Sequence, residues 1–263
     1  MSAEGMNTGG LYVFLGPTLP HGDAVRELDA AILPPVAQGD IIRLCARKPR
    51  AIGIVDGFFE NVPSVWHKEI LHAISQGVAV FGAASMGALR AAELHPFGMT
   101  GVGAVFEAFR DGRLEDDDEV AVIHGPAELG YPSLSEAMVN IRRTLADAAG
   151  DGVIPAATAR RLEAIAKALP YRDRGYGRVL RLAADQGVPD EELADLRLWL
   201  PNGRFDQKRD DAREMLRAMR RWAARGAPAP EARFHFERTV LWERAVRDAA
   251  SSAGYPPPAW PPI

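Results

Sequence analysis

The sequence predicts an α/β fold: an N-terminal, mostly parallel sheet with flanking helices, followed by an all-helical C-terminal region. From Leu11 to about Ile123, short apolar runs alternate with helical patterns and with glycines, which is typical of βα units. Past Gly150 the composition shifts to Ala, Leu and Arg, and apolar residues recur with helical spacing. We therefore expect two domains, an α/β core domain over residues 1–150 and a helical region over residues 151–263 that ends in a proline-rich tail.

The strongest strand signals are three apolar runs, each followed by a loop of small or polar residues. They are Leu11–Leu15, Ala51–Val55 and Val78–Ala83. The carboxyl ends of parallel strands meet at one edge of a sheet, and ligands usually bind at that edge. We therefore expect Asp56, which follows the second run, and Ser85, which follows the third, to share a cleft.

Helical patterns connect and follow these strands. Ser64 is expected to cap a helix that ends at Gly77, and a second helix is expected over Met86–Leu94, before Pro96. The apolar stripe of the first helix is Trp66, Ile70, Ala73 and Ile74. Further helices are expected over 156–169, 179–185, 191–200, 206–224 and 239–250, with a linker at 226–231 and an extended tail at 255–263.

Length and composition are those of an ordinary globular protein, with 263 residues, 47% hydrophobic and 25% charged. The apolar runs are far shorter than the roughly 18 residues that a membrane span needs, so we expect no membrane association. Residues 1–10 contain no basic side chain, which argues against a secretory signal and predicts a cytoplasmic protein. A net charge of −4 provides no overall attraction to nucleic acid, so no nucleic-acid partner is expected.

The sequence lacks the common patterns that bind metals or nucleotides. A single cysteine, Cys45, excludes an internal disulfide and a cysteine-based zinc site. The spacing of His67 and His72 does not place two ligands on one face of a helix. Gly101 and Gly103 lack the third glycine of a dinucleotide-binding loop. We therefore expect no metal and no cofactor.

The turn at Ser85 resembles a nucleophile elbow, because a strand turns sharply through small residues into a helix that begins with serine. The helix N-terminus directs amide groups and a positive dipole end at the space above Ser85, so the amides of Met86 and Gly87 are candidates for holding an oxyanion. The alternative is that Ser85 is an ordinary helix cap that satisfies the amide of Gly87 or Ala88.

A serine nucleophile needs a base, and the nearby candidates are His67, Lys68 and His72. A lysine base must be neutral, which requires burial or a neighbouring positive charge such as Arg90. Helical periodicity places Lys68 away from the apolar stripe and His67 nearer to it. Periodicity therefore does not select Lys68, whose alternative is a solvated lysine, and His67 is equally consistent with an inert packed histidine.

Two charged stretches each have a purely structural interpretation, as solvent-exposed surface, beside a functional one. The acidic run from Glu115 to Glu119 is expected to be a solvated loop. A helix in the second half has a basic surface, expected to be either a solvated face or a docking strip. Its residues are Gln207, Lys208, Arg209, Arg213, Arg217, Arg220 and Arg221.

Four segments of the sequence together resemble the TfuA-like family. They are Val13–Thr18, Ile54–Gly57, Val65–Leu71 and Gly82–Leu94. The resemblance continues through Gly98–Gly103 and Asp117–Ala121 to about Arg142. In the helical half, Gln207, Lys208 and Asp211 look like a further family element.

Members of this family act beside YcaO enzymes, which use ATP to activate a peptide backbone amide so that sulfur can replace its oxygen. The resemblance implies that the chain hydrolyses the C-terminal thiocarboxylate of a small ThiS-like carrier protein and releases sulfide to the YcaO partner. It also implies help in engaging the precursor peptide, and leaves open a direct contact with that peptide. The family's Ser-Lys pair matches Ser85 and Lys68 here.

With this chemistry, Met86 and Gly87 supply the oxyanion amides, and Arg90, Asp56 and His67 are expected to bind substrate. The carrier's C-terminus is expected to pass the loops after Val55 and Ala83, so that a wide side chain at Gly87 obstructs it. A non-catalytic scaffold for the carrier and YcaO is the alternative function. A general serine esterase ranks last, because no apolar acyl-binding motif accompanies the serine.

Overall fold

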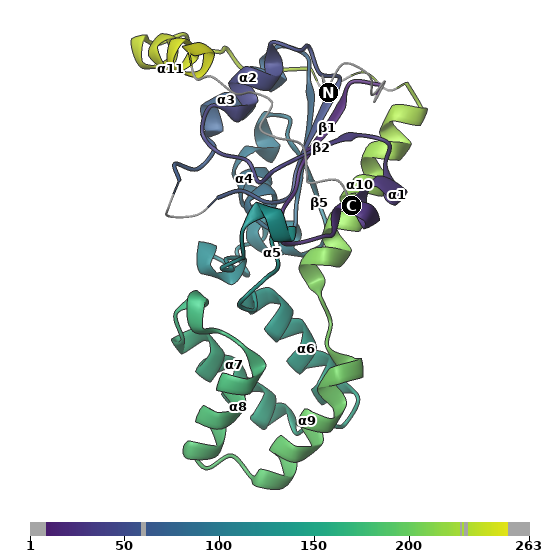
Figure 1. The fold of residues 1–263 in the computed structure, drawn as a ribbon, viewed down its shortest axis with the longest axis vertical. Helices are drawn as coiled ribbons and strands as arrows, with labels where there is room; N and C mark the ends of the chain where they lie inside the picture. The colour runs from purple at the N-terminus through teal and green to yellow at the C-terminus, as the bar shows by residue number, and fades with distance from the viewer. Residues whose placement is uncertain (1–8, 59–61, 227, 229–230, 252–263) are drawn as a thin grey trace. The chain divides into compact units, whose positions relative to one another are not determined.

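The computed structural model describes residues 9–58, 62–226, 228 and 231–251 (Figure 1). The chain forms two compact units, which we call the α/β unit (residues 1–115, 126–131 and 209–263) and the helical unit (residues 116–125 and 132–208). The predicted fold class, an N-terminal parallel sheet with flanking helices followed by a helical region, is confirmed. The two units divide the chain differently from the predicted boundary at residue 150, because the segment after residue 208 returns to the α/β unit.

The α/β unit is built on five parallel strands in the order β2-β1-β3-β4-β5. The strands are β1 (Leu11–Phe14), β2 (Ala31–Leu33), β3 (Ala51–Ile54), β4 (Ala79–Ala83) and β5 (Thr100–Val102). The three predicted strands are confirmed to within one residue at each end. The edge strands β2 and β5 were not predicted, because three residues are too few for a periodic pattern.

Helices flank the sheet and continue the chain into its C-terminal part. Those of the α/β unit are α1 (His21–Glu27), α2 (Asp40–Cys45), α3 (His67–Ser75), α4 (Met86–Leu94), α5 (Ala104–Arg110), α11 (Val240–Ser251) and most of α10 (Gln207–Ala224). The short 3-10 helices are η1 (His95–Phe97) and η3 (Ala127–Leu129). The predicted bounds of α4 are confirmed, and Pro96 lies within η1 just after it.

The predicted Ser64 cap on α3 is wrong. The helix begins at His67, and the Glu69 carboxylate accepts the backbone N–H of Trp66 at 3.3 Å. The Ser64 hydroxyl instead donates to the carbonyl of Phe58 at 3.1 Å. The Glu69 carboxylate thus binds the amide of the N-cap residue itself, which is the glutamate half of a capping box, and no serine hydroxyl caps the helix.

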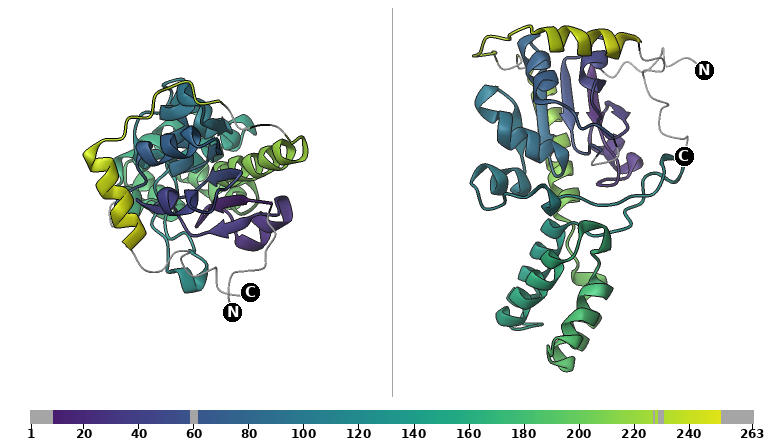
Figure 2. Two further views of the ribbon diagram at one scale, coloured as in Figure 1. Left: turned by 90° about the horizontal axis from the view of Figure 1, so that it is seen from above. Right: turned by 90° about the vertical axis from the view of Figure 1, so that its left-hand side faces the viewer.

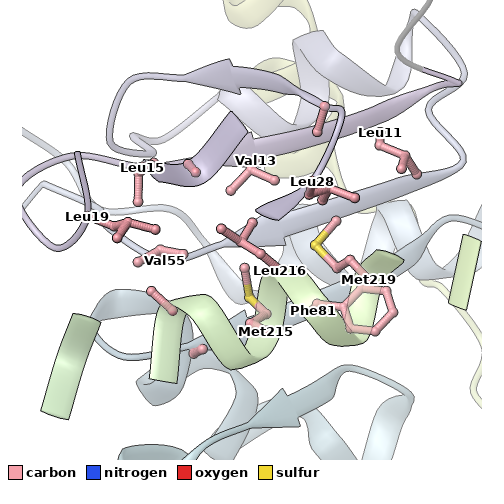
Figure 3. Close-up of a cluster of buried hydrophobic side chains, with 14 of the residues drawn as sticks. Leu11, Val13, Leu15, Leu19, Leu28, Val55, Phe81, Met215, Leu216 and Met219 are labelled. Carbon is pink, nitrogen blue, oxygen red and sulfur yellow. The ribbon is translucent and has the colours of Figure 1, made fainter. Parts of the chain in front are cut away.

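The buried core of the α/β unit lies between the sheet and α10. Met215, Leu216 and Met219 of α10 are fully buried and face apolar side chains of the strands, among them Val13 and Phe81 (Figure 3). An amphipathic helix far along the sequence therefore completes the core of the N-terminal sheet.

The basic surface of α10 pairs with acidic residues of α1. Arg213 forms an ion pair with Asp23 at 2.7 Å, and Arg217 binds both carboxylate oxygens of Glu27 at 2.7 and 2.9 Å. Arg220 donates to the backbone carbonyl of Glu27 at 3.0 Å. Three arginines of the predicted basic strip thus contact this chain's own first helix, and two of them, Arg217 and Arg220, are also exposed, as a solvated face predicts.

The helical unit packs its own core from α6 (Met138–Gly150), α7 (Ala156–Ala168), α8 (Tyr176–Asp185) and α9 (Asp190–Gly203). Two 3-10 helices, η2 (Asp117–Glu119) and η4 (Tyr171–Asp173), belong to this unit. The fully buried residues Met138, Ile141 and Leu162 lie in this core. The predictions of α7, α8 and α9 are confirmed.

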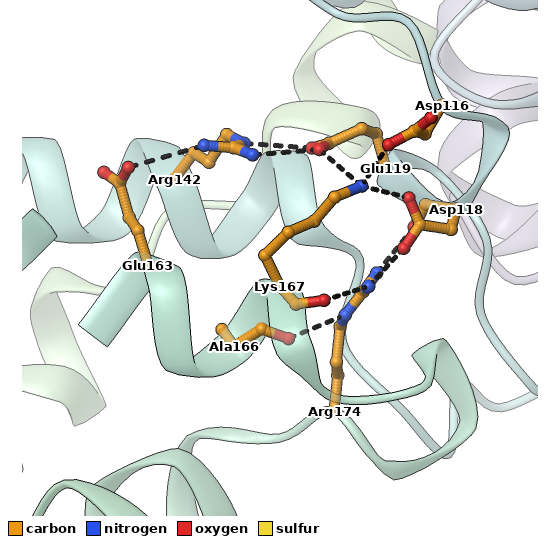
Figure 4. A network of polar contacts seen from close by, with 8 residues as sticks. All are labelled: Asp116, Asp118, Glu119, Arg142, Glu163, Ala166, Lys167 and Arg174. Carbon is orange, nitrogen blue, oxygen red and sulfur yellow. Dashed lines mark hydrogen bonds and ion pairs between the residues drawn. The ribbon is translucent and has the colours of Figure 1, made fainter. Parts of the chain in front are cut away.

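The prediction of a solvated loop for the acidic run from Glu115 to Glu119 is wrong for its last two residues, although residues 115–117 are exposed. Glu119 is 3% exposed, and Arg142 holds both of its oxygens at 2.9 Å (Figure 4). Lys167 bridges Glu119 and Asp116, each at 3.0 Å. The carboxylates therefore join η2 to α6 and α7.

Asp118 completes this network through Lys167 and the fully buried side chain of Arg174. Burial by itself raises the pKa of Asp118, but the hydrogen bonds from Lys167 and Arg174 and their charges outweigh it and lower the pKa. Arg174 also donates to the carbonyls of Asp118 at 2.6 Å and Ala166 at 3.0 Å. A network with several shared partners holds the helices more firmly than isolated surface pairs do.

None of the helices in the described part of the chain has both the length and the apolar content that a bilayer crossing requires.

Candidate active site at the carboxyl edge of the sheet

Ser85 occupies a tight turn between β4 and α4. Ala84, the residue before it, has φ of +66°, a left-handed conformation that is uncommon for a residue with a Cβ atom. The Ser85 amide donates to the carbonyl of Ala83 at 2.7 Å, which closes the turn. Ser85 itself is 3% exposed and is the N-cap residue of α4. A strained backbone beside a buried hydroxyl is typical of functional sites.

The Ser85 hydroxyl does not act as a cap. No described residue forms a hydrogen bond with it, and the Ala88 amide instead bonds to the backbone carbonyl of Ser85 at 2.9 Å. The Met86 amide also has no hydrogen-bond partner among the residues that the structure describes. The hydroxyl and one amide at the positive end of α4 are therefore available to a ligand.

The oxyanion role predicted for Gly87 does not fit this structure. Its amide donates to the carbonyl of Val55 at 3.2 Å. A Cβ atom at position 87 would lie 1.7 Å from the carbonyl oxygen of Ile54, and one at Gly82 would lie 2.2 Å from the carbonyl oxygen of Gly87. These two glycines let α4 approach β3 and β4 by direct backbone contact, so a wider side chain at Gly87 disturbs packing instead of blocking a substrate.

Asp56 lies at the same edge of the sheet, as predicted. The residue after it, Gly57, is so close to Met86 that an added Cβ would lie 2.7 Å from that side chain. The Asp56 carboxylate is only 2% exposed and is already occupied. It accepts the amides of Gly16 at 2.8 Å and Thr18 at 3.1 Å, and the Thr18 hydroxyl at 2.6 Å. Its role in this structure is to fix the loop after β1 beside the serine turn.

Lys68 lies in the first turn of α3 and is partly buried. Its Nζ atom donates to the Thr239 hydroxyl at 3.3 Å and lies 5.5 Å from the centre of the Phe236 ring. No hydrogen bond joins Lys68 to Ser85 among the described residues. The structure therefore does not join the expected pair by a hydrogen bond, and the pair remains a prediction.

Arg90 and His67 both bind Glu93. Arg90 donates to Glu93 at 2.9 Å and to the carbonyl of Val65 at 3.2 Å, and His67 Nε2 lies 2.6 Å from the Glu93 carboxylate. Burial by itself raises the pKa of Glu93. The hydrogen bond from His67 and the charge of Arg90 together outweigh this effect, so the net shift of the pKa is downward. This cluster ties α3 to α4, and the Arg90 charge is largely compensated by Glu93.

Glu69 is a site residue that the sequence did not single out. It is fully buried and accepts the Gly39 amide at 2.9 Å and the Trp66 amide at 3.3 Å. Burial, together with the nearby charge of Asp40, raises the pKa of Glu69 to about 7, against the effect of the amide hydrogen bonds. Its position in the first turn of a helix was the available signal, because acidic residues there bind backbone amides.

Asp211 belongs to the same edge. Its carboxylate is buried and accepts the Val105 amide at 2.7 Å, just beyond β5. The neighbouring residue Gly103 has no room for a Cβ atom, which would lie 2.4 Å from the Asp211 carboxylate carbon. In the helical unit, Lys208 is also buried and donates to the carbonyl of Val120 at 2.9 Å. Asp211 and Lys208 of the predicted family element are thus buried polar residues whose partners lie 106 and 88 positions away in the sequence.

A cavity of about 480 Å³ lies elsewhere in the α/β unit, between α2, residues 62–66 and α11. It is lined by Gln38, Gly39, Ile42, Arg43, Val62, Pro63, Trp66, Leu241, Arg244, Ala245, Asp248 and Ala249. Neither Ser85 nor Lys68 lines it. Within the described ranges, no group of three or more His, Cys, Asp or Glu side chains is placed to hold a metal ion.

These features define an α/β protein whose parallel sheet presents a buried serine at a strand–helix turn. Residues 56–175 match the family model of the TfuA-like proteins, a stretch that contains Ser85, α3 and the ion-pair network of the helical unit. The resemblance to the TfuA-like family that the sequence predicted is thus confirmed over this region. No curated protein matches the chain.

Proposed function

We propose that this TfuA-like protein hydrolyses the C-terminal thiocarboxylate of a ThiS-like carrier protein and supplies the sulfide to a YcaO partner that thioamidates a precursor peptide. The family match supports the general assignment. The observation that carries the chemistry is the Ser85 hydroxyl, which lies at a helix N-terminus in a strained turn and makes no capping hydrogen bond.

In this proposal Ser85 Oγ attacks the thiocarboxyl carbon while a neutral Lys68 accepts its proton. The Met86 amide and the dipole of α4 stabilise the charge that develops on the carbonyl oxygen. The carbon–sulfur bond then breaks, and Lys68 returns its proton to the departing sulfur. Water hydrolyses the acyl-serine, so that one thiocarboxylate and one water yield one carboxylate and one hydrogen sulfide.

The direct test is sulfide release from a thiocarboxylated carrier by Ser85→Ala. Because the hydroxyl makes no hydrogen bond to a described residue, we expect the variant to fold normally, with a change in stability below about 1 kcal/mol. Ser75→Ala, which alters a serine at the end of α3, is the matched control. Wild-type sulfide release by folded Ser85→Ala protein would overturn the nucleophile assignment.

The base is tested by Lys68→Arg beside Lys68→Ala. Arginine keeps the charge but does not become neutral at working pH, so both variants should lose sulfide release. His67 is the alternative base, since its ring contacts Glu93 as a histidine oriented by a carboxylate would. An active Lys68→Arg protein and an inactive His67→Ala protein would assign the base to His67.

A non-catalytic scaffold is the second candidate function. Two observations favour it: the Gly87 amide is occupied by Val55, and Lys68 is bound by Thr239. A scaffold should increase thioamidation by YcaO and bind both partners while releasing no sulfide from the carrier alone. Measuring sulfide release without YcaO, and partner binding by pull-down, separates the two functions.

A further inference from the structure

Residues 232–239 form an extended segment, which we call the strap, that precedes α11 and belongs to the α/β unit. Its side chains alternate in exposure although it forms no strand. Ala232, Phe234 and Phe236 are half-buried, and Arg233, His235 and Glu237 are exposed. Figure 2 shows this segment and α11 in yellow at the end of the unit that carries α2 and α3. The alternation means that one side of the strap is held against the unit.

Aromatic contacts attach the strap at two points. Phe234 packs edge-on against Phe97 of η1, with ring centres 5.9 Å apart. Phe236 lies 5.3 Å from the His72 ring of α3 and 5.1 Å from Trp242 of α11, which is 1% exposed. Burial, aided by the charge of Arg238, lowers the pKa of His72. The strap therefore crosses α3 beside Lys68.

The strap takes up the Lys68 side chain at its C-terminal end. The Thr239 hydroxyl accepts both Lys68 Nζ and the Trp242 amide, each at 3.3 Å, so one atom caps α11 and binds the lysine. The centre of the Phe236 ring lies 5.5 Å from the ammonium nitrogen, so a cation–π contact also holds the side chain in place. With these contacts, Lys68 forms no hydrogen bond with Ser85 among the described residues.

We propose that the strap is an autoinhibitory element that holds Lys68 on Thr239 and Phe236, so that the lysine reaches Ser85 only when the strap is displaced. This inference rests on the proposed function, and it accounts for the absence of a hydrogen bond between the two expected catalytic residues in the described structure. The strap is suited to displacement because it has no backbone ladder and is attached mainly by side chains. Sulfide release by the wild-type protein is then limited by the small fraction of molecules in which the strap is displaced.

The test compares full-length Phe236→Ala with Arg233→Ala, a control in which an exposed strap residue is changed. Two quantities are measured: sulfide release from the thiocarboxylated carrier, and the rate at which an N-hydroxysuccinimide acetate reagent acetylates Lys68, relative to the exposed Lys48, by peptide mass spectrometry. We expect Phe236→Ala to raise both by roughly threefold to tenfold, because the open fraction of the lysine increases. Arg233→Ala should change neither. Thr239→Val, which removes the hydroxyl acceptor, should shift both in the same direction.

The two readouts separate failure of the strap from failure of the proposed function. Ser85-dependent sulfide release that is unchanged in Phe236→Ala and Thr239→Val overturns the strap, whether or not acetylation rises. If no protein releases sulfide, the hydrolase proposal fails, and the inhibitory role fails with it. In that case faster acetylation of Lys68 still supports the strap as a cover over the lysine, and unchanged acetylation overturns that as well.

Discussion

The two units use buried carboxylates for different purposes. In the α/β unit, Asp56, Glu69 and Asp211 accept backbone amides of loops and helix starts around the carboxyl edge of the sheet. In the helical unit, Asp118 and Glu119 accept arginine and lysine side chains from α6, α7 and the residue that follows η4. A carboxylate that binds amides fixes the path of a loop, whereas one that binds cations joins elements that already have their shape.

Because of this difference, the carboxylates near the candidate site hold its loops and helix starts in position. Asp56 fixes the loop from Gly16 to Thr18 beside the serine turn, and Glu69 fixes the start of the helix that carries Lys68. Losing such a carboxylate should move site residues as well as weaken the fold. Losing a carboxylate of the helical unit should weaken that unit and leave the chemistry of Ser85 unchanged.

The largest change in stability is expected at Gly87, where the backbone of α4 contacts the backbone of β3 directly. Gly87→Ala should lower the free energy of unfolding by about 3 kcal/mol or more, because the added Cβ atom has no space against Ile54. Gly150→Ala, at the end of α6, is the control: its Cβ meets no atom within 4 Å, and we expect about 0.4–1 kcal/mol of stabilisation. Urea unfolding of both variants measures the contrast. Equal stability of the two would show that α4 can move away from the sheet.

Next in size is Glu119→Ala in the helical unit. It leaves Arg142 and Lys167 without a shared acceptor, and we expect a loss of about 2–3 kcal/mol, less than for a fully buried pair because both cations are partly exposed. Arg178→Ala, which removes an exposed pair with Asp173, should cost about 0.5 kcal/mol. Sulfide release at a temperature where the variant is folded should remain at the wild-type level. A folded Glu119→Ala protein without sulfide release would contradict the view that the carboxylates of the helical unit stabilise the fold without affecting the chemistry of Ser85.

Asp56→Asn tests the corresponding prediction for a carboxylate of the α/β unit. The amide nitrogen would face the donors of Gly16 or Thr18, so we expect a loss of about 1–2 kcal/mol in unfolding free energy. Unlike Glu119→Ala, this variant should also reduce sulfide release, because the loop beside Ser85 loses its anchor. The kinetic loss should persist at temperatures where circular dichroism shows a fully folded protein. Unchanged kinetics would mean that the loop does not shape the site.

The sequence predicted the parts of the fold that depend on local patterns. The central strands and α4 combine apolar runs with glycine or proline boundaries, and their bounds were confirmed to within one residue. The buried state of Glu119 was not predictable in the same way, because its partners Arg142 and Lys167 come from later helices. A run of acidic residues looks the same whether it faces water or distant cations.

The candidate site shows the same limit. That Asp56 and Ser85 share an edge followed from the rule for parallel sheets, and it was correct. The contact of Lys68 with Thr239 joins residues 171 positions apart, which no spacing in the sequence encodes. The Gly87 amide donates to Val55 because α4 lies very close to the sheet. The small residues in the sequence indicate that such a close approach is allowed, but they do not indicate which amide forms a hydrogen bond there.

The smallest effect at neutral pH is expected for Glu69→Gln, and its value lies in the pH dependence. Burial raises the pKa of Glu69 from 4.5 to about 7, so the folded protein binds this proton more tightly than the unfolded chain does. The stabilising contribution is complete below pH 4.5 and is lost as the pH rises through about 7. Glutamine resembles the neutral acid, so Glu69→Gln should remove this dependence of the unfolding free energy on pH and differ from wild type by about 1 kcal/mol or less at pH 7.

Urea unfolding from pH 4.5 to 8 measures the slope of the unfolding free energy against pH, with Glu163→Gln in the helical unit as a control for a half-exposed acid. An identical slope in wild type and Glu69→Gln would show that the amides of Gly39 and Trp66 keep this carboxylate charged, and that the amide-binding carboxylates of the α/β unit carry no pH dependence of their own.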